Sequence, residues 1–113
     1  MNQIKISLLH LALKAGALAE NYDLLARGIH AASALQADWV VAPELCISGY
    51  EFTDAIGTEW IAAHPDRWTL RICELASKLK LTILFGHVES EATGQLYNIA
   101  INGRSGRKDH RTT

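Results

Sequence analysis

Apolar residues recur every three or four positions in two stretches of the chain, and this spacing predicts two amphipathic helices. The first covers residues 17–36. The second covers residues 65–79, where Pro65 suits the first turn because its missing N–H needs no partner there. In the first helix the apolar positions are Leu18, Tyr22, Leu25, Ile29, Ala32 and Leu35. Polar and charged residues fall between them, so we expect one face of each helix to pack against the rest of the protein.

Four further stretches are rich in apolar and β-forming residues, and they predict strands. They are residues 4–13, 39–42, 81–88 and 95–101. The first two flank the first helix and should therefore form a right-handed β-α-β unit with parallel strands. Residues 91–94 have the composition of a hairpin turn, so the last two strands should be antiparallel. The predicted order is β-α-β-loop-α-β-β, an α/β sheet that is parallel at first and antiparallel at its end.

The composition is typical of one small globular domain spanning residues 1–113. Of the 113 residues, 49% are hydrophobic and 20% charged. No apolar run approaches the roughly 18 residues that a membrane helix needs, and charged residues interrupt the region where a signal peptide would lie. Two cysteines without a CxxC spacing are too few for a disulfide framework. We therefore expect a cytoplasmic chain without a membrane partner.

Charge is distributed unevenly along the chain. Residues 1–103 contain seven Lys or Arg against eleven Asp or Glu, whereas residues 104–113 contain four against one. A short basic end on an acidic chain is more often a solvated tail than a nucleic-acid site. The segment 103–108 also lacks the spacing of a phosphate-binding loop, and the five histidines lack metal-ligand spacing. The sequence thus predicts no nucleic-acid partner, no metal and no cofactor.

The candidate chemistry centres on Glu44, which closely follows the predicted strand at residues 39–42. Open α/β sheets place their ligand crevices at the carboxyl ends of such strands. Residues 43–64 then form a connection longer than a compact domain normally needs, and long loops often carry function. A carboxylate at this place can serve as a general base. From the residues alone, a turn-capping or solvated Glu44 is the favoured interpretation.

Several motifs in this chain resemble those of the nitrilase or carbon–nitrogen hydrolase superfamily. The matching segments are Asn21-Tyr22 with Ala37-Asp38, Pro43-Glu44-Leu45 with Gly49-Tyr50, Leu75-Ala76, residues 83–89, and Leu96-Tyr97-Asn98. They follow one another in the order of that family's pattern, and the combination is more specific than any one of them. The resemblance covers residues 4 to about 101 and leaves residues 102–113 as a basic tail.

The resemblance implies an α-β-β-α sandwich, of which this chain would supply the amino-terminal half with both helices on one side of its sheet. In that family a cysteine thiolate attacks an amide or nitrile carbon, a glutamate is the general base and a lysine stabilises the oxyanion. By resemblance, Glu44 is the general base. Lys108 is the candidate oxyanion cation, although the matching segment 110–113 has threonine where the family has lysine. A solvated Lys108 is an equal alternative.

The nucleophile has no counterpart in this chain. The family's cysteine lies in the second half of its domain, and neither Cys46 nor Cys73 matches its motif. We therefore expect a carbon–nitrogen hydrolase portion that is inactive alone and, if completed, acts on a small amide or nitrile and forms a homo-oligomer. The alternatives are a non-catalytic module that uses its exposed sheet for association, and a truncated fragment.

Overall fold

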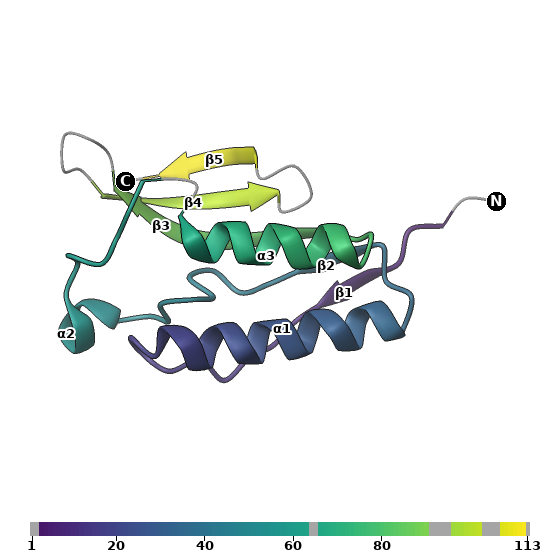
Figure 1. Ribbon diagram of the computed structural model, residues 1–113, viewed down its shortest axis with the longest axis horizontal. Helices are drawn as coiled ribbons and strands as arrows, with labels where there is room; N and C mark the ends of the chain where they lie inside the picture. Colours follow the sequence, from purple (N-terminus) through teal and green to yellow (C-terminus); the bar gives the residue numbers. More distant parts are fainter. Residues whose placement is uncertain (1–2, 64–65, 91–95, 103–106, 113) are drawn as a thin grey trace.

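One five-stranded sheet and three helices make up the part of the chain that the computed structural model describes, residues 3–63, 66–90, 96–102 and 107–112 (Figure 1). In chain order the elements are β1 (Ile6–Leu8), α1 (Leu18–Ala34), β2 (Trp39–Val41), α2 (Phe52–Ile56), α3 (Arg67–Lys78), β3 (Thr82–Ser90), β4 (Leu96–Asn102) and β5 (Arg107–Thr112). The strands lie in the order β1-β2-β3-β4-β5. Strands β1 to β3 are parallel, whereas β3 to β5 are antiparallel. The predicted α/β class, with its change of strand direction, is confirmed.

Three elements differ from the predictions. Strand β1 is only three residues long, and Leu9, Leu11 and Leu13 pack against the core from the irregular segment that follows it. Their hydrophobicity was a sign of burial rather than of a strand. A short helix, α2, lies within the predicted long loop. The expected basic tail contains strand β5, which pairs with β4. The predicted place of Pro65 in the first turn of the second helix lies outside the described residues.

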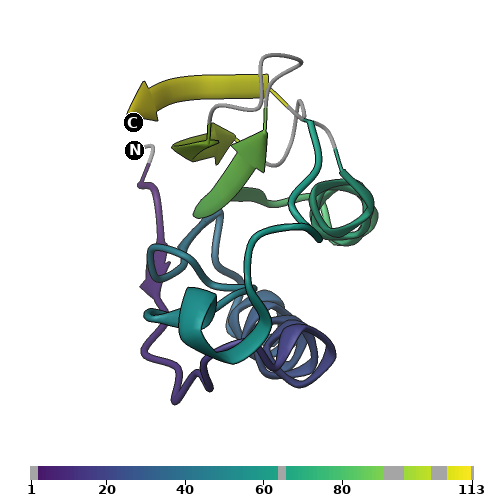
Figure 2. The same ribbon diagram turned by 90° about the vertical axis from the view of Figure 1, so that its left-hand side faces the viewer.

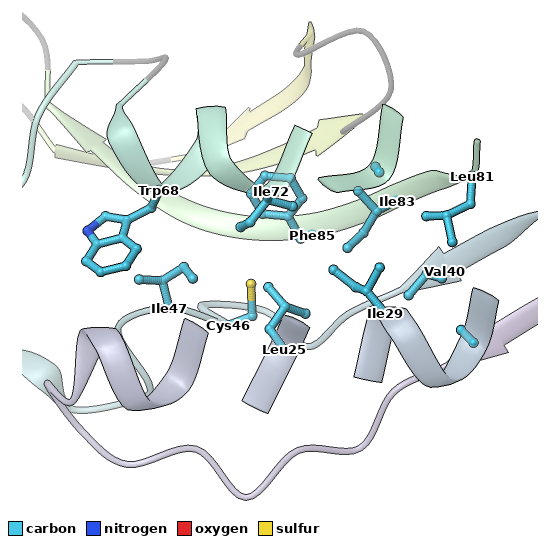
Figure 3. Packing of buried hydrophobic residues seen from close by; sticks show 12 residues of the cluster. Leu25, Ile29, Val40, Cys46, Ile47, Trp68, Ile72, Leu81, Ile83 and Phe85 are labelled. Atoms are coloured by element: carbon cyan, nitrogen blue, oxygen red, sulfur yellow. The ribbon is translucent and has the colours of Figure 1, made fainter. Parts of the chain in front are cut away.

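Helices α1 and α3 cover the same face of the sheet, as Figure 2 shows. The two parallel crossovers, from β1 to β2 and from β2 to β3, step in one direction across the sheet. Right-handed crossovers that step in one direction place their helices on one side. The main core lies between these helices and the sheet (Figure 3). It includes Leu25 and Ile29 of α1, Trp68 and Ile72 of α3, Val40 of β2, and Ile83 and Phe85 of β3.

Both of these helices end in the same backbone motif. After α1, Gln36 adopts a left-handed conformation with φ of 64°. The Ala37 N–H then turns back and donates to the Ala32 carbonyl at 3.0 Å. This arrangement satisfies carbonyls that a helix end otherwise leaves unpaired. Helix α3 ends likewise at Lys80, with φ of 57°, and each motif turns the chain directly into the next strand.

The opposite face of the sheet carries apolar side chains that neither α1 nor α3 covers. Ser7 pairs in register with Val40, which is buried under the helices, so Ile6 and Leu8 point to the other face. Their side chains are 56% and 64% exposed. A sheet with a core on one face and exposed isoleucine and leucine on the other is typical of a layer that packs against a further layer.

A buried carboxylate fixes the beginning of α3. The Oδ1 of Asp66 accepts a hydrogen bond from the Thr69 N–H at 2.9 Å, and its Oδ2 lies 2.7 Å from Nε2 of His87 on β3. The two side chains are 8% and 1% exposed. Burial alone raises the pKa of Asp66, but the hydrogen bond and charge of His87, together with the Thr69 N–H, outweigh it and hold the pKa below its usual range. The pair therefore joins the first turn of α3 to the middle strand.

The lowered pKa of Asp66 predicts a specific acid sensitivity. Its contribution to the free energy of unfolding is complete above the unfolded pKa of about 4 and is lost as the pH falls through the lower folded value. Asp66→Asn keeps a capping oxygen but loses the charge. We expect this variant to be less stable near neutral pH by roughly 1–3 kcal/mol and to lose less further stability in acid than the wild type.

Urea unfolding followed by circular dichroism, near neutral pH and below a pH of about 4, measures both effects. Glu74→Gln is the control, because it removes an exposed carboxylate from the same helix. Equal acid sensitivity of Asp66→Asn and the wild type would contradict the role given to this pair.

Candidate active site

After β2 ends, the chain runs along the edge of β3 that β2 no longer covers. The Ala42 N–H donates to the Leu84 carbonyl at 2.9 Å, and the Cys46 N–H donates to the Gly86 carbonyl at 3.3 Å. The irregular segment thus continues the backbone pairing that β2 began. This pairing places Glu44 beside β3, at the carboxyl end of β2, where the sequence predicted a ligand crevice.

Gly86 allows the backbone of Glu44 to lie directly against β3. A Cβ on Gly86 would lie 3.1 Å from the Cα of Glu44 and 3.2 Å from the backbone nitrogen of Leu45. Side chains alternate between the two faces of a strand, and Phe85 faces the helices, so a Cβ on Gly86 would point to the other face. Glu44 therefore lies on the face of the sheet that α1 and α3 do not cover, which we call the open face. The Glu44 side chain is exposed there, which leaves its carboxylate accessible to a ligand.

The backbone turns sharply at Leu45, whose φ of 53° is left-handed. Such a conformation costs a non-glycine residue roughly 1–3 kcal/mol, so it persists only where the surroundings hold it. Leu45 is held by a second apolar cluster, formed with Phe52, Ile61 and Val88. The turn thereby sends neighbouring side chains in different directions: Glu44 to solvent and Leu45 into this cluster.

The end of the same turn contacts the segment that precedes α1. The Gly16 N–H donates to the Ser48 carbonyl at 2.7 Å. Gly49 has a left-handed φ of 72°, and a Cβ there would lie 2.9 Å from the Lys14 carbonyl oxygen. The two segments are therefore in backbone contact, and only glycine fits at this point of closest approach.

A polar residue that sequence reasoning missed also joins these segments. Asn21 was quoted only as part of the family resemblance, yet it is fully buried on α1 and bonds the backbone of Lys14 and Ile47. The signal that could have revealed it is its spacing. Asn21 occupies the same helical stripe as Leu25 and Ile29, and a polar residue in an apolar stripe needs buried partners.

Cys46 is a core thiol. It is fully buried in the main cluster, with its Sγ 3.7 Å from the Gly86 carbonyl oxygen. Burial raises the pKa of this thiol to about 12. A thiol with that pKa is protonated at neutral pH and is a poor nucleophile. Cys73 lies half-buried on α3, and neither cysteine forms a disulfide bond within the described ranges.

Lys108 lies on β5, in register with Ile101 of β4 and beside an irregularity of the strand pairing at Ala100. Strands β3 and β4 separate β5 from β2 in the sheet. The side chains of β5 are outside the described part of the chain. The described residues therefore position Glu44 and its turn, and the role of Lys108 stays a prediction.

An open hollow of about 670 Å³ lies at the carboxyl ends of β1 and β2 and reaches Pro43, the neighbour of Glu44. Residues 8–12 and 41–43 line it. Among the residues that the structure describes, no group of three or more His, Cys, Asp or Glu side chains could hold a metal ion. No helix in the described ranges is long and apolar enough to cross a membrane.

Comparison with models of known protein families identifies the family of this chain. The family model of carbon–nitrogen hydrolases matches residues 2–108. This chain belongs to the carbon–nitrogen hydrolase family. The predicted membership is thus confirmed, and the match includes Glu44 and ends at Lys108, the second residue of β5. No curated protein sequence matches the chain closely enough to count as a relative.

Solved structures share the fold of this carbon–nitrogen hydrolase chain. Nit3 of Saccharomyces cerevisiae, a member of branch 10 of the nitrilase superfamily, is 23% identical with a TM-score of 0.77. An amidase from Nesterenkonia sp. AN1 is 18% identical with a TM-score of 0.74, and a glutamine-dependent NAD(+) synthetase from Cytophaga hutchinsonii is 22% identical with a TM-score of 0.73. Each alignment covers 96% of this chain but only 42%, 43% and 18% of those chains, respectively. This chain therefore spans less than half the length of these proteins.

The contact between Gly86 and Glu44 predicts the effect of one added methyl group. Gly86→Ala must push the backbone of Glu44 away from β3, and we expect a loss of roughly 1–3 kcal/mol in the free energy of unfolding. The amide resonances of Glu44 and Leu45 should move as well. Gly28→Ala is the control, because the atoms nearest to its added Cβ belong to the flexible side chain of Leu9 and not to a backbone.

Urea unfolding and two-dimensional NMR of both variants measure these effects. A Gly86→Ala variant with wild-type stability and unchanged Glu44 resonances would show that the close approach does not hold this turn.

Proposed function

We propose that this chain is the amino-terminal portion of a carbon–nitrogen hydrolase for non-peptide C–N bonds, and that Glu44 is its general base. The observation that carries the proposal is the place of Glu44. Its carboxylate is exposed on the open sheet face, at the carboxyl end of β2, and Gly86 and the turn at Leu45 hold its backbone. Family membership supplies a reaction that needs a base at such a position.

In this reaction Glu44 takes the proton of a cysteine thiol while the sulfur attacks the amide or nitrile carbon. From an amide, the nitrogen leaves as ammonia after it has received the proton held by Glu44, and a thioester remains. From a nitrile, the first adduct is a thioimidate, which must add one water molecule before ammonia can leave and the same thioester remains. A further water molecule, deprotonated by Glu44, then cleaves the thioester to the carboxylic acid, and the thiol regains its proton. The Nesterenkonia amidase has an active-site cysteine, which has added acrylamide in a variant of that enzyme. Because Cys46 is a buried, protonated thiol and neither Cys46 nor Cys73 matches the family's cysteine motif, we place the nucleophile outside these 113 residues.

For the oxyanion we propose Lys108 as the stabilising cation. A positive charge beside the oxygen acts mainly in the transition state, where the negative charge develops. Lys108 lies on a strand of the same sheet as β2, and the resemblance places the family's lysine near this part of the chain. The substrate of the completed protein would be a small amide or nitrile. Two cysteines that do not form a disulfide bond suit a cytoplasmic protein.

A second candidate function is association without catalysis. The exposed Ile6 and Leu8 on the face of the sheet that α1 and α3 do not cover favour it, because such a surface is usually covered by another layer or subunit. The same surface supports assembly into a homo-oligomer. The effect of replacing Glu44 distinguishes the two functions. A hydrolase loses its activity without this carboxylate, whereas association through the exposed sheet face does not need it.

The proposal predicts that the 113-residue chain alone releases no ammonia from simple amides or nitriles above the buffer background. The covalent step lacks its thiolate, and the remaining groups cannot replace it. An enzyme-coupled ammonia assay measures this. Turnover that Glu44→Gln abolishes would show that the chain is active by itself and would overturn the placement of the nucleophile.

In the protein completed by a cysteine-bearing second half, Glu44→Gln should lower kcat by roughly 10²–10⁴-fold. Glu59→Gln, which changes another exposed glutamate of the same long connection, is the matched control and should leave kcat unchanged. Loss of charge at Lys108 through Lys108→Met should lower kcat as well. Wild-type kcat for Glu44→Gln would refute Glu44 as the general base.

A further inference from the structure

Asn21 is a fully buried polar residue that the proposed reaction does not use. Its side chain is 0% exposed, in the stripe of α1 that also buries Leu25, Ile29 and Ala32. Burying an amide without hydrogen-bond partners costs roughly 1–3 kcal/mol by mutational measures. The hydrogen-bond partners of Asn21 therefore indicate its role.

Within the described part of the chain, the side-chain hydrogen bonds of Asn21 go to backbone groups outside α1. Its Oδ1 accepts from the Lys14 N–H at 2.9 Å, and its Nδ2 donates to the Lys14 carbonyl and to the Ile47 carbonyl, both at 2.8 Å. The orientation of the amide follows from these partners, because an N–H can only donate and a carbonyl can only accept. One side chain thus joins α1 to two irregular segments.

The bond to Ile47 acts on the turn that carries Glu44. Residues 45–49 are all buried, and the Cys46 N–H is already bonded to the Gly86 carbonyl on β3. The turn is therefore held at Cys46 by the sheet and at the next residue by Asn21. A shift of the turn relative to α1 would break the bond to Ile47 and would move Glu44 relative to the sheet face.

We propose that Asn21 is a positioning residue for Glu44. Its side-chain amide fixes the turn at residues 44–48 against α1 and so sets where the Glu44 carboxylate lies on the open face. The catalytic meaning of this role rests on the proposed function, in which Glu44 is the base. The structural part of it, that Asn21 holds this turn in particular, does not depend on activity.

Asn21→Asp provides the sharpest test. The aspartate has the same shape and still accepts from the Lys14 N–H, but its ionised form cannot donate to either carbonyl. Ile29→Val is the matched control, because it removes a methyl group from the same buried stripe at a cost of about 0.5–1.5 kcal/mol. If Asn21→Asp does not fold, Asn21→Ser, which is smaller and can still donate one hydrogen bond, takes its place.

Amide hydrogen exchange and NMR on the 113-residue chain give the readout. The reporters of the turn are the amides of Gly16, Cys46 and Gly49, and the reporter of the rest of the fold is the amide of Thr82, bonded to the Asp38 carbonyl. In Asn21→Asp we expect exchange at the turn to rise at least about tenfold more than at Thr82. The side-chain carbon resonances of Glu44 should also shift, whereas Ile29→Val should leave them unchanged.

Exchange that rises equally at the turn and at Thr82, or Glu44 resonances that stay at their wild-type positions, would overturn the positioning role. In the completed protein, Asn21→Asp should lower kcat with little change in KM. If Glu44→Gln leaves kcat unchanged there while the exchange result holds, the proposed function fails and the structural link between Asn21 and the turn remains.

Discussion

The structure depends on how the long middle strand is paired. Strand β3 has nine residues, whereas its parallel neighbour β2 has three. Buried backbone N–H and C=O groups need hydrogen-bond partners. The edge of β3 that faces β2 extends beyond the end of β2, so other segments must pair with the rest of it. The segment from Ala42 to Cys46 does this first, and Ala62 accepts from the Ser90 N–H at 3.0 Å further along. The candidate base sits in the segment that provides this irregular pairing.

Much of the fold was predictable, because hydrophobic periodicity reports burial directly. Helices α1 and α3 and strands β2 to β4 were found from it, with limits that differ by a few residues. It failed for residues 9–13, whose leucines are partly buried against the core without forming a strand. It also failed for β5, a polar sequence that becomes a strand because β4 offers a pairing edge. Both errors arise from contacts between distant parts of the chain, which local patterns do not contain.

The candidate site was predictable only in part. The place of Glu44 followed from the end of β2 and from the family resemblance. The structural features that hold Glu44 in place could not be predicted from the sequence. The left-handed turn at Leu45, the missing side chain of Gly86 and the bond from Asn21 to Ile47 each involve groups brought together only by the folded chain. Of these, Asn21 alone left a trace in the sequence, as a polar residue in an apolar stripe.

The sheet order has a consequence for how the chain is made. Every strand pairs with the strand before it in the sequence, from β1 to β5. No later strand has to insert between two that are already paired, so the sheet can grow at one edge in the order in which the ribosome releases it. The β1-α1-β2 unit can form while residues of β3 are still being synthesised. The turn that carries Glu44 gains its partner at Gly86 only when β3 arrives, so the candidate site is completed late in this order.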